Sequence, residues 1–350
     1  MRTILLVGGG TLGSVNPLLA TAAALKKVSP DIRCIFWGER NDRDKKVVEE
    51  AGIPFSVIPA GKFRRYFSIR NIIDAPVIAW ATIVAWRKLR TLKPAMVVTA
   101  GSYVVVPVMW AARWLQIPVL LYQQDVTLGL ANKLIAKHAS IRCAVAEAQA
   151  LLLPQPVAVV GYALRPDLRT GDAARAATTY GLRQGKPTIL VIGGSSGALE
   201  LNRRLISALP FLQPDIQVIH ITGEGKAVPT VRKNYVPISF TNRELPDLYA
   251  LASFVVSRAG SNVLAELIAL GKPALIVPLP NTHQVQNAAA LEERGVLVRA
   301  EQDLTPEVFA ELLNSTVGNP QRLAELRTAT ACIWDTDGAK NLAALISKNL

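Results

Sequence analysis

One sequence pattern occurs twice in the chain of 350 residues, once at the N-terminus and once near the midpoint. Residues 3–13 and 188–197 each hold an apolar run and a glycine-rich turn, and helical patterns follow at residues 18–28 and 199–209. Such an apolar run is typical of a strand in a parallel sheet that helices cover on both faces. Two copies predict an α/β chain with two domains. The length agrees, because single hydrophobic cores stop growing near roughly 250 to 300 residues.

Further strand candidates support a parallel sheet in each half, and helical stretches separate them, as crossover connections require. They are residues 33–37, 96–99, 119–122 and 157–160 in the first half, and 217–221, 254–257 and 274–277 in the second. Prolines and glycines favour a linker at residues 161–170. We expect two Rossmann-like domains, 1–163 and 164–335, that face each other across a cleft, with a C-terminal helix in 336–350 that packs back on the first domain.

Positive charge is concentrated in the first half of the chain. Lys and Arg outnumber Asp and Glu by 39 to 26 in the whole sequence, a net charge of +13, and by 21 to 9 in residues 1–165. This asymmetry indicates an anionic partner for the first half: a nucleic acid, a phosphorylated substrate or a membrane surface. The alternative is a generally basic proteome.

The cysteines and the apolar runs restrict the cellular setting. The three cysteines lack metal-ligand or redox spacing, so a reducing cytosol is the default. The apolar N-terminal run is too short for a signal peptide. Two uncharged 19-residue runs, 94–112 and 273–291, contain prolines and polar residues, and therefore predict strands, loops and helices rather than membrane spans.

The glycine turns after the two repeated strands are candidates for phosphate binding, because a turn that enters a helix exposes backbone N–H groups at the positive end of the helix dipole. Three glycines of the first turn have the spacing of a dinucleotide-binding turn: Gly8, Gly10 and Gly13. Glu39 lies where such a fold binds ribose. These residues favour a nicotinamide oxidoreductase, but that function does not explain the motifs of the second half. The second turn adds the hydroxyls of Ser195 and Ser196, which can bind phosphate or cap the helix. The alternative for both turns is tight geometry alone.

Two further motifs of the second half follow predicted strands. In residues 257–266, Arg258 can offset phosphate charge, the backbone at Ser261 can approach the phosphate, and Glu266 can accept hydrogen bonds from two ribose hydroxyls. The alternative makes Ser261 a helix cap and Glu266 a solvated side chain. Residues 282–287 supply polar side chains suited to a sugar, at the carboxyl end of a parallel strand, where open α/β sheets bind ligands.

At these motifs the chain resembles the GT-B glycosyltransferases and, within them, the MurG family, and the similarity extends over nearly the whole sequence. The motifs that carry it are Gly9-Gly10-Thr11 with Pro17, Gly101-Ser102-Tyr103 with Pro107, residues 129–133, Arg165, Gly193-Gly194-Ser195, residues 258–266, and His283-Gln284 with Asn287. The resemblance implies a GT-B fold. It also implies inverting transfer of N-acetylglucosamine from UDP-N-acetylglucosamine to undecaprenyl-pyrophosphoryl-N-acetylmuramyl-pentapeptide (lipid I), which gives lipid II in peptidoglycan synthesis.

The resemblance also implies roles for single residues. Thr11 and Gly13 would face the reaction centre from the acceptor domain, and Glu266 would hold the uridine ribose. The residues implied near the diphosphate, the nucleotide or the donor sugar are Arg165, Ser195, Ser196, Phe240, Thr241, Arg258, Ser261, His283, Gln284 and Asn287.

The chemistry expected is metal-independent and needs no cofactor beyond the donor, because the sequence has no Asp-x-Asp motif and only three histidines. Helix dipoles, Ser195 and Arg258 would stabilise the departing diphosphate. Ser14 occupies the position of the family's histidine and cannot accept a proton unaided near neutral pH. Asp125, where the family usually has asparagine, is therefore the candidate base. The alternative for Asp125 is a turn residue before Gly129.

Residues 62–93 contain eight basic residues and one acid, interleaved with apolar side chains as in a membrane-surface element. The residues expected to contact the membrane or the acceptor are Lys62, Arg64, Arg65, Phe67, Arg70 and Trp80. A helix is expected to start at Asp74 and Pro76 and to carry Trp80 and Trp86. The alternative places both tryptophans in the core. The expected location is peripheral, on the cytoplasmic face of the cell membrane.

Other hypotheses remain open. RNA is the poorest, since no RNA-binding signature accompanies the basic and aromatic residues. A GT-B transferase with another UDP-sugar or acceptor, and a nucleotide-sugar-binding relative without activity, both fit the sequence. His138 is expected at the surface and His220 in the core. The oligomeric state does not follow from the sequence.

Overall fold

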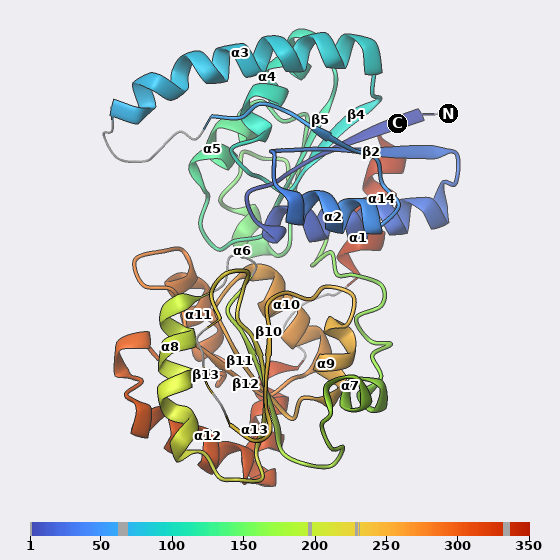
Figure 1. Cartoon of the computed structure of the whole chain (residues 1–350). Helices are drawn as coiled ribbons and strands as arrows, with labels where there is room; N and C mark the ends of the chain where they lie inside the picture. Colours follow the sequence, from blue (N-terminus) through green and yellow to red (C-terminus); the bar gives the residue numbers. More distant parts are fainter. Residues whose placement is uncertain (1, 62–68, 195–197, 228–229, 231, 332–336) are drawn as a thin grey trace. The chain divides into compact units, whose positions relative to one another are not determined.

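A computed structural model describes residues 2–61, 69–194, 198–227, 230, 232–331 and 337–350, with the backbone alone for residues 69–75. The chain forms two compact units. Unit 1 comprises Met1–Arg165 with Asp335–Leu350, and unit 2 comprises Pro166–Trp334. Each unit is built around its own parallel sheet (Figure 1).

Unit 1 alternates strands and helices along the chain. Its strands are β1 (Arg2–Val7), β2 (Ile32–Gly38), β3 (Phe55–Val57), β4 (Met96–Thr99), β5 (Val119–Gln123), β6 (Ile141–Ala144) and β7 (Ala158–Val159). Its helices are α1 (Leu12–Val28), α2 (Asp42–Glu50), α3 (Ile69–Leu92), α4 (Val105–Trp114), α5 (Leu130–Ala136), α6 (Glu147–Ala150) and α14 (Gly338–Lys348). The described strands pair in parallel in the order β3-β2-β1-β4-β5-β6-β7.

Helices cover both faces of the unit 1 sheet, with α3, α4 and α5 on one face and α1, α2 and α14 on the other (Figure 1). The apolar run of β1 is buried on both sides, which explains why it does not alternate with polar residues. Helix α14 returns to this unit from the end of the chain. Its Asn341 donates to the carbonyl of Val160 (2.9 Å), and Gly338 lies so close to Gly161 that a Cβ there would be 2.3 Å from the Gly161 oxygen.

Unit 2 repeats this plan. Its strands are β8 (Thr188–Ile192), β9 (Gln217–Ile221), β10 (Tyr235–Ile238), β11 (Phe254–Ser257), β12 (Ala274–Ile276) and β13 (Leu297–Val298). Its helices are α7 (Ala173–Tyr180), α8 (Leu199–Ala208), α9 (Leu245–Leu251), α10 (Ser261–Leu270), α11 (Gln284–Glu292), α12 (Pro306–Val317) and α13 (Pro320–Thr330), with short 3-10 helices η1 (Leu209–Phe211) and η2 (Glu301–Asp303). The described strands are again all parallel, in the order β10-β9-β8-β11-β12-β13.

The predicted fold class, two parallel-sheet α/β domains, is confirmed. Two helix starts were predicted too late. Helix α1 begins at Leu12 rather than at residue 18, and α3 begins at Ile69 rather than near Asp74, so Pro17 and Pro76 both lie inside helices. A proline inside a helix removes one backbone donor. In α1 the carbonyl that Pro17 leaves without a donor belongs to Gly13, and the side chain of Gln124 donates to it (3.2 Å).

Candidate functional site

Both sheets have a topological switch point. In unit 1 the strand order reverses between β1 and β4, and in unit 2 it reverses between β8 and β11. Helices that leave the two central strands go to opposite faces of the sheet, so the carboxyl ends of those strands are where doubly wound folds bind ligands. At the first point the glycine turn after β1 meets residues 101–103, and at the second the end of β8 meets Arg258, whose N–H donates to the Ile192 carbonyl (3.4 Å).

At the unit 1 switch point, hydroxyl groups hold the first glycine turn. The Gly9 N–H donates to Ser14 Oγ (3.0 Å), and the Ser14 hydroxyl lies 3.1 Å from the Gly9 oxygen. Ser102, which follows β4, donates to the same Gly9 oxygen (2.9 Å). Ser14 is buried, so its position favours a structural role in this turn. Thr11 is exposed, and Gly13 is half-buried behind it.

Tyr103 and Glu39 close the other side of this turn. The Tyr103 hydroxyl donates to Glu39 Oε2, and a Cβ on Gly10 would lie 3.1 Å from the Tyr103 ring. Burial and the hydrogen bond to Glu39 both raise the pKa of Tyr103. Glu39, the residue at which a dinucleotide fold would bind ribose, is therefore bonded to a tyrosine of its own unit.

Asp125, the candidate base, lies just beyond β5 and is half-buried. Its carbonyl accepts a hydrogen bond from Gln123 Nε2 (2.7 Å), while Asn132 donates to Gln123 Oε1 (2.7 Å). The neighbouring Gln124 is bonded to Gly13, so the structure brings the Asp125 segment to the first glycine turn. Burial and the Asp125 charge raise the pKa of Tyr162, whose hydroxyl lies 3.4 Å from the Gln124 oxygen.

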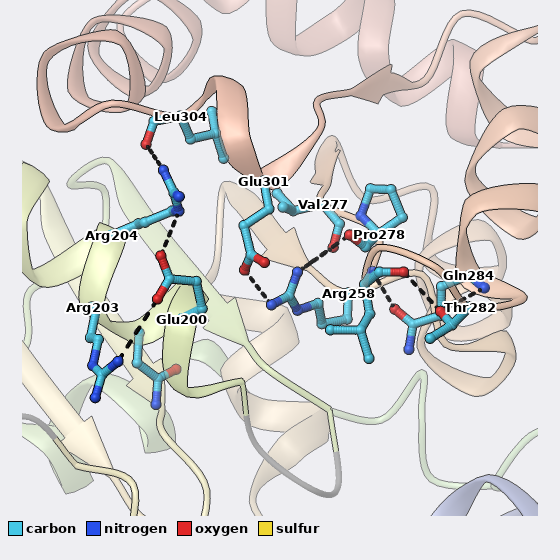
Figure 2. Close-up of polar contacts among 12 residues, drawn as sticks. Glu200, Arg203, Arg204, Arg258, Val277, Pro278, Thr282, Gln284, Glu301 and Leu304 are labelled. Carbon is cyan, nitrogen blue, oxygen red and sulfur yellow. Dashed lines mark hydrogen bonds and ion pairs between the residues drawn. The ribbon is translucent and has the colours of Figure 1, made fainter.

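In unit 2, the turn between β11 and α10 is fixed by buried polar contacts. Arg258 is only 5% exposed and pairs with Glu301, and its Nη1 donates to the carbonyls of Val277 (3.2 Å) and Pro278 (3.4 Å), as Figure 2 shows. The expectation that Arg258 offsets phosphate charge overlooked Glu301, which already supplies a counter-charge. Asn287 of α11 holds the next residue of the turn through the carbonyl of Ala259 (3.0 Å).

Helix α10 begins at Ser261, and its N-cap is Gly260, which has no side chain with which to cap the helix. The suggestion that Ser261 is the cap residue is therefore wrong. Gly260 has a φ of −77°, which any residue adopts, and a Cβ built on it would meet no atom of the described residues within 4 Å.

Glu266 lies one turn further along α10 and is 5% exposed, so the alternative of a solvated side chain is wrong. Its Oε2 accepts a hydrogen bond from the Tyr249 hydroxyl (2.8 Å). Gln284 starts α11, and its Oε1 accepts from the N–H of Leu279 (3.0 Å). His283 precedes it and is exposed. These groups share the carboxyl edge with the α10 start.

The remaining predicted donor residues are not brought next to the start of α10 by the described contacts. Phe240 and Thr241 follow the edge strand β10. Since neighbouring strands lie roughly 4.8 Å apart and β9 and β8 intervene, they are about 14 Å from β11 along the sheet. Arg165 is half-buried at the end of the first segment of unit 1. Ser195 and Ser196 lie outside the described residues.

Helix α3 exposes an apolar stripe followed by cations. Trp80 is 56% exposed, so its assignment to the core is wrong, and Ile83 is 44% exposed. Arg87 and Arg90 continue the same side and are exposed. Trp86 instead packs against the unit 1 core, and the Arg90 guanidinium lies 4.8 Å from its ring centre. The other residues predicted to contact the membrane or the acceptor lie outside the described part of the chain. These are the side chain of Arg70 and the whole of Lys62, Arg64, Arg65 and Phe67.

Among the described residues, no helix is long and apolar enough to cross a membrane, and no group of three or more His, Cys, Asp or Glu side chains is arranged to hold a metal ion. The two other histidines lie as expected. His138 is exposed beside Arg113, and His220 is fully buried in β9.

Sequence reasoning missed Glu301, Tyr249 and Asn202. Glu301 follows β13, a strand of two residues that gives no recognisable pattern, and Tyr249 lies on α9. Asn202 on α8 holds the loop after β9, because its Nδ2 donates to the carbonyls of Thr222 (2.8 Å) and Lys226 (3.0 Å). The one signal in the sequence for Asn202 was its position, since it places an amide in the first turn of a helix that follows a glycine turn.

The architecture matches solved glycosyltransferases. The crystal structure of Acinetobacter baumannii MurG superposes with a TM-score of 0.72 and 26% identity, and the match covers 99% of both chains. The chain therefore has the GT-B fold of that enzyme.

Sequence comparison defines the family. Residues 4–141 match the glycosyltransferase family 28 N-terminal domain, and residues 188–346 match the family's C-terminal domain. The chain belongs to glycosyltransferase family 28 and is a glycosyltransferase. Two relatives are named UDP-N-acetylglucosamine--N-acetylmuramyl-(pentapeptide) pyrophosphoryl-undecaprenol N-acetylglucosamine transferase. The one from Lachnospira eligens is 36% identical over 88% of this chain and 89% of its own, and the one from Clostridium botulinum (strain Loch Maree) is 34% identical over 99% of both.

Proposed function

We propose that this protein transfers N-acetylglucosamine from UDP-N-acetylglucosamine to undecaprenyl-pyrophosphoryl-N-acetylmuramyl-pentapeptide and so forms lipid II for peptidoglycan. The observation that carries the proposal is similarity along nearly the entire chain to relatives named for this reaction. Under this proposal, unit 1 takes the lipid-linked acceptor and unit 2 takes the UDP-sugar.

On the donor side, the start of α10 supports binding of the diphosphate. Backbone N–H groups of a first helical turn favour an anion, and the N-cap here is a glycine, which allows a phosphate to approach the backbone closely. The buried carboxylate of Glu266 is suited to the ribose hydroxyls, and the polar start of α11, with His283, Gln284 and Asn287, is suited to the sugar. Phe240, Thr241, Arg165, Ser195 and Ser196 complete the proposed donor set.

On the acceptor side, we assign the base to Asp125. Its carboxylate would take the proton of the muramyl C4 hydroxyl as that oxygen bonds to C1 of N-acetylglucosamine, while the C1–O bond to UDP breaks and UDP leaves with the electron pair. The hydroxyl of Ser14 is bonded within the glycine turn, which supports Asp125 rather than Ser14 in this role. Thr11 and Gly13 lie on the turn that would face the acceptor.

The helix dipole of α10 would stabilise the leaving diphosphate, so the transfer is proposed to need no metal ion. The exposed stripe of α3 supports peripheral binding to the cytoplasmic face of an anionic membrane, because apolar side chains enter the interface while arginines meet headgroups. Vesicle co-sedimentation tests this: Trp80→Ser should lower binding to anionic vesicles about fivefold. Trp114→Ser, which changes a tryptophan that is 66% exposed at the end of α4, should not.

The experiment that tests the function is turnover of UDP-N-acetylglucosamine with a short-chain lipid I analogue in the presence of EDTA, with wild type and Asp125→Asn in parallel. Product from wild type alone supports the transferase and the base. Product from both proteins leaves the reaction standing and removes Asp125 as the base. No product despite UDP binding contradicts the proposed acceptor, and a panel of UDP-sugars and acceptors then identifies another reaction or shows an inactive binding protein.

A further inference from the structure

The ion pair between Arg258 and Glu301 joins three segments at the carboxyl edge of the unit 2 sheet. Arg258 follows β11, the carbonyls of Val277 and Pro278 follow β12, and Glu301 begins η2 after β13. Figure 2 shows the guanidinium between these groups. The side chains of Arg258 and Glu301 are 5% and 10% exposed, so both charges are removed from water and neutralise each other.

A second contact holds the other end of η2, at its C-cap Leu304. Arg204 of α8 donates to the carbonyl of Leu304 (2.9 Å), and it also pairs with Glu200 (3.1 Å) (Figure 2). Glu301 is thus attached to a short helix whose end is itself fixed to α8. A carboxylate on such a support gives the guanidinium of Arg258 a defined position.

Arg258 in turn fixes the backbone that enters α10. Its own N–H donates to the Ile192 carbonyl at the end of β8 (3.4 Å), and the carbonyl of Ala259 accepts from Asn287. Gly260 and the first N–H groups of α10 follow directly. The orientation of these N–H groups therefore depends on how Arg258 is held.

We propose that Glu301 is a positioning residue for donor binding. By pairing with Arg258 it fixes the turn so that the first N–H groups of α10 meet the donor diphosphate, and the charge of Arg258 is used within the protein rather than on the phosphates. This inference rests on the proposed function, because it needs unit 2 to bind a UDP-sugar.

The opposite role for Arg258 predicts an opposite result. If Arg258 bound the diphosphate and Glu301 merely competed for it, removing the carboxylate would raise the positive charge at the site and tighten UDP binding. If Glu301 positions the turn, removing it leaves a buried guanidinium without a counter-charge, the turn moves, and UDP binding weakens. The sign of the change separates the two.

The test is calorimetric titration of the full chain with UDP, together with KM and kcat for UDP-N-acetylglucosamine. We expect Glu301→Ala to weaken UDP binding and to raise KM about tenfold while kcat falls less than about threefold, since positioning acts on donor binding in the ground state. Glu301→Gln, which keeps an oxygen for Arg258, should lose about threefold. Arg258→Lys keeps the charge but not the fork, and should resemble Glu301→Ala.

The matched control is Glu325→Gln, which removes the same charge from an exposed pair with Arg322 on α13 and should leave UDP binding unchanged. Melting curves check folding, and if Glu301→Ala unfolds, Glu301→Gln and Arg258→Lys decide the result. Equal or tighter UDP binding by folded Glu301 variants overturns the positioning role while the function stands. Wild type that neither binds UDP nor transfers the sugar overturns the proposed function, and the positioning role with it.

Discussion

The sheets at the two switch points have the same strand order, but different contacts hold the turns at their carboxyl edges. In unit 1 the glycine turn is closed by its own protein: Ser14 and Ser102 both reach the Gly9 carbonyl, and Tyr103 packs on Gly10 with Glu39 behind it. In unit 2 the side chains of Arg258 and Asn287 donate to carbonyls around the turn, and the N-cap of α10 is a glycine. We call the first edge the closed edge and the second, with glycine at the helix start, the open edge.

This difference indicates which ligand each edge is suited to bind. A helix start with glycine as its N-cap lets an anion approach the backbone N–H groups of the first turn. A turn whose carbonyl already accepts two hydroxyls is rigid and positions residues around it, such as Asp125 through the bond from Gln124 to Gly13. We therefore connect the open edge with the UDP diphosphate and the closed edge with the acceptor. Substitutions at the closed edge should accordingly change stability, and substitutions at the start of α10 should change ligand binding.

Gly101→Ala should have the largest effect, on the stability of unit 1. Gly101 has a φ of +95°, and a Cβ there would lie 2.3 Å from the Asn132 side chain, which is bonded to Gln123. We expect a loss of about 3 kcal/mol in the free energy of unfolding, from backbone strain and the displaced amide together. Urea unfolding measures it. Gly52→Ala, with a φ of +73° and no atom within 4 Å, isolates the strain and should lose only about 1 kcal/mol. Equal losses would show that Asn132 moves without cost.

Acidification should destabilise the network beneath the open edge. Asn202 Oδ1 accepts a hydrogen bond from His220 Nε2–H (3.0 Å). His220 Nδ1 therefore carries no proton and accepts a hydrogen bond from the Tyr235 hydroxyl (2.9 Å). A second proton on the ring would have to replace this bond. Burial lowers the pKa of His220 from 6.5 to about 4. The unfolded chain therefore binds the proton first, and stability present above pH 6.5 is lost as the pH falls towards 4. From pH 7 to pH 5 this amounts to about 2 kcal/mol.

The measurement is urea unfolding at both pH values for wild type, His220→Gln and His138→Gln. His220→Gln should be less stable at pH 7 but should lose about 2 kcal/mol less than wild type on acidification. Desolvation and the charges of Arg113 and Lys137 lower the pKa of His138, but its side chain is exposed and solvent screens these charges, so its replacement should change the pH dependence much less than His220→Gln does. An unchanged pH dependence in His220→Gln would mean that carboxylates account for all of the acid sensitivity.

Gly260→Ala should separate stability from binding at the open edge. The backbone conformation admits a methyl group, which meets no atom of the described residues, and the lower entropy of the unfolded chain offsets the poorer N-cap, so stability should change by less than about 1 kcal/mol. UDP affinity should fall about tenfold if the diphosphate approaches this backbone. Gly181→Ala, at a left-handed helix end with φ +64°, should show the reverse pattern of lower stability and unchanged UDP affinity. Full UDP affinity in Gly260→Ala would place the diphosphate elsewhere.

The sequence predicted the central strands and the edge strand β7, but it missed the edge strands β3, β10 and β13 and the inner strand β6. Strands β4, β9 and β11 have the predicted bounds, because burial on both sides demands an uninterrupted apolar run. Strands β3 and β13 have three and two residues at sheet edges, and such short segments carry no periodic pattern. In β6 the run is interrupted by Arg142, which removes the signal.

For the site, position along the strands was predictable and contacts across the sheet were not. Arg258, Glu266 and Asn287 were placed correctly at strand ends or helix starts, because parallel strands bring their carboxyl ends to one edge. The partner of Arg258 lies 43 residues away, beyond a strand that was itself missed. A charge partner at that separation depends on register and packing, which single-sequence patterns do not contain.

The smallest effect sharpens the account of the closed edge. Ser102 has a φ of +127°, and its hydroxyl donates to the Gly9 carbonyl and accepts from the N–H of Val104 (3.3 Å). Ser102→Ala keeps the unfavourable backbone and loses both bonds, so unfolding should become easier by about 1 kcal/mol. Ser102→Gly loses the same bonds but relieves the backbone, so its cost in urea unfolding should be within about 0.5 kcal/mol of zero. If alanine costs no more than glycine, the hydroxyl bonds and not the conformation set the stability of this turn, and the closed edge is held by Ser14 and Ser102 alone.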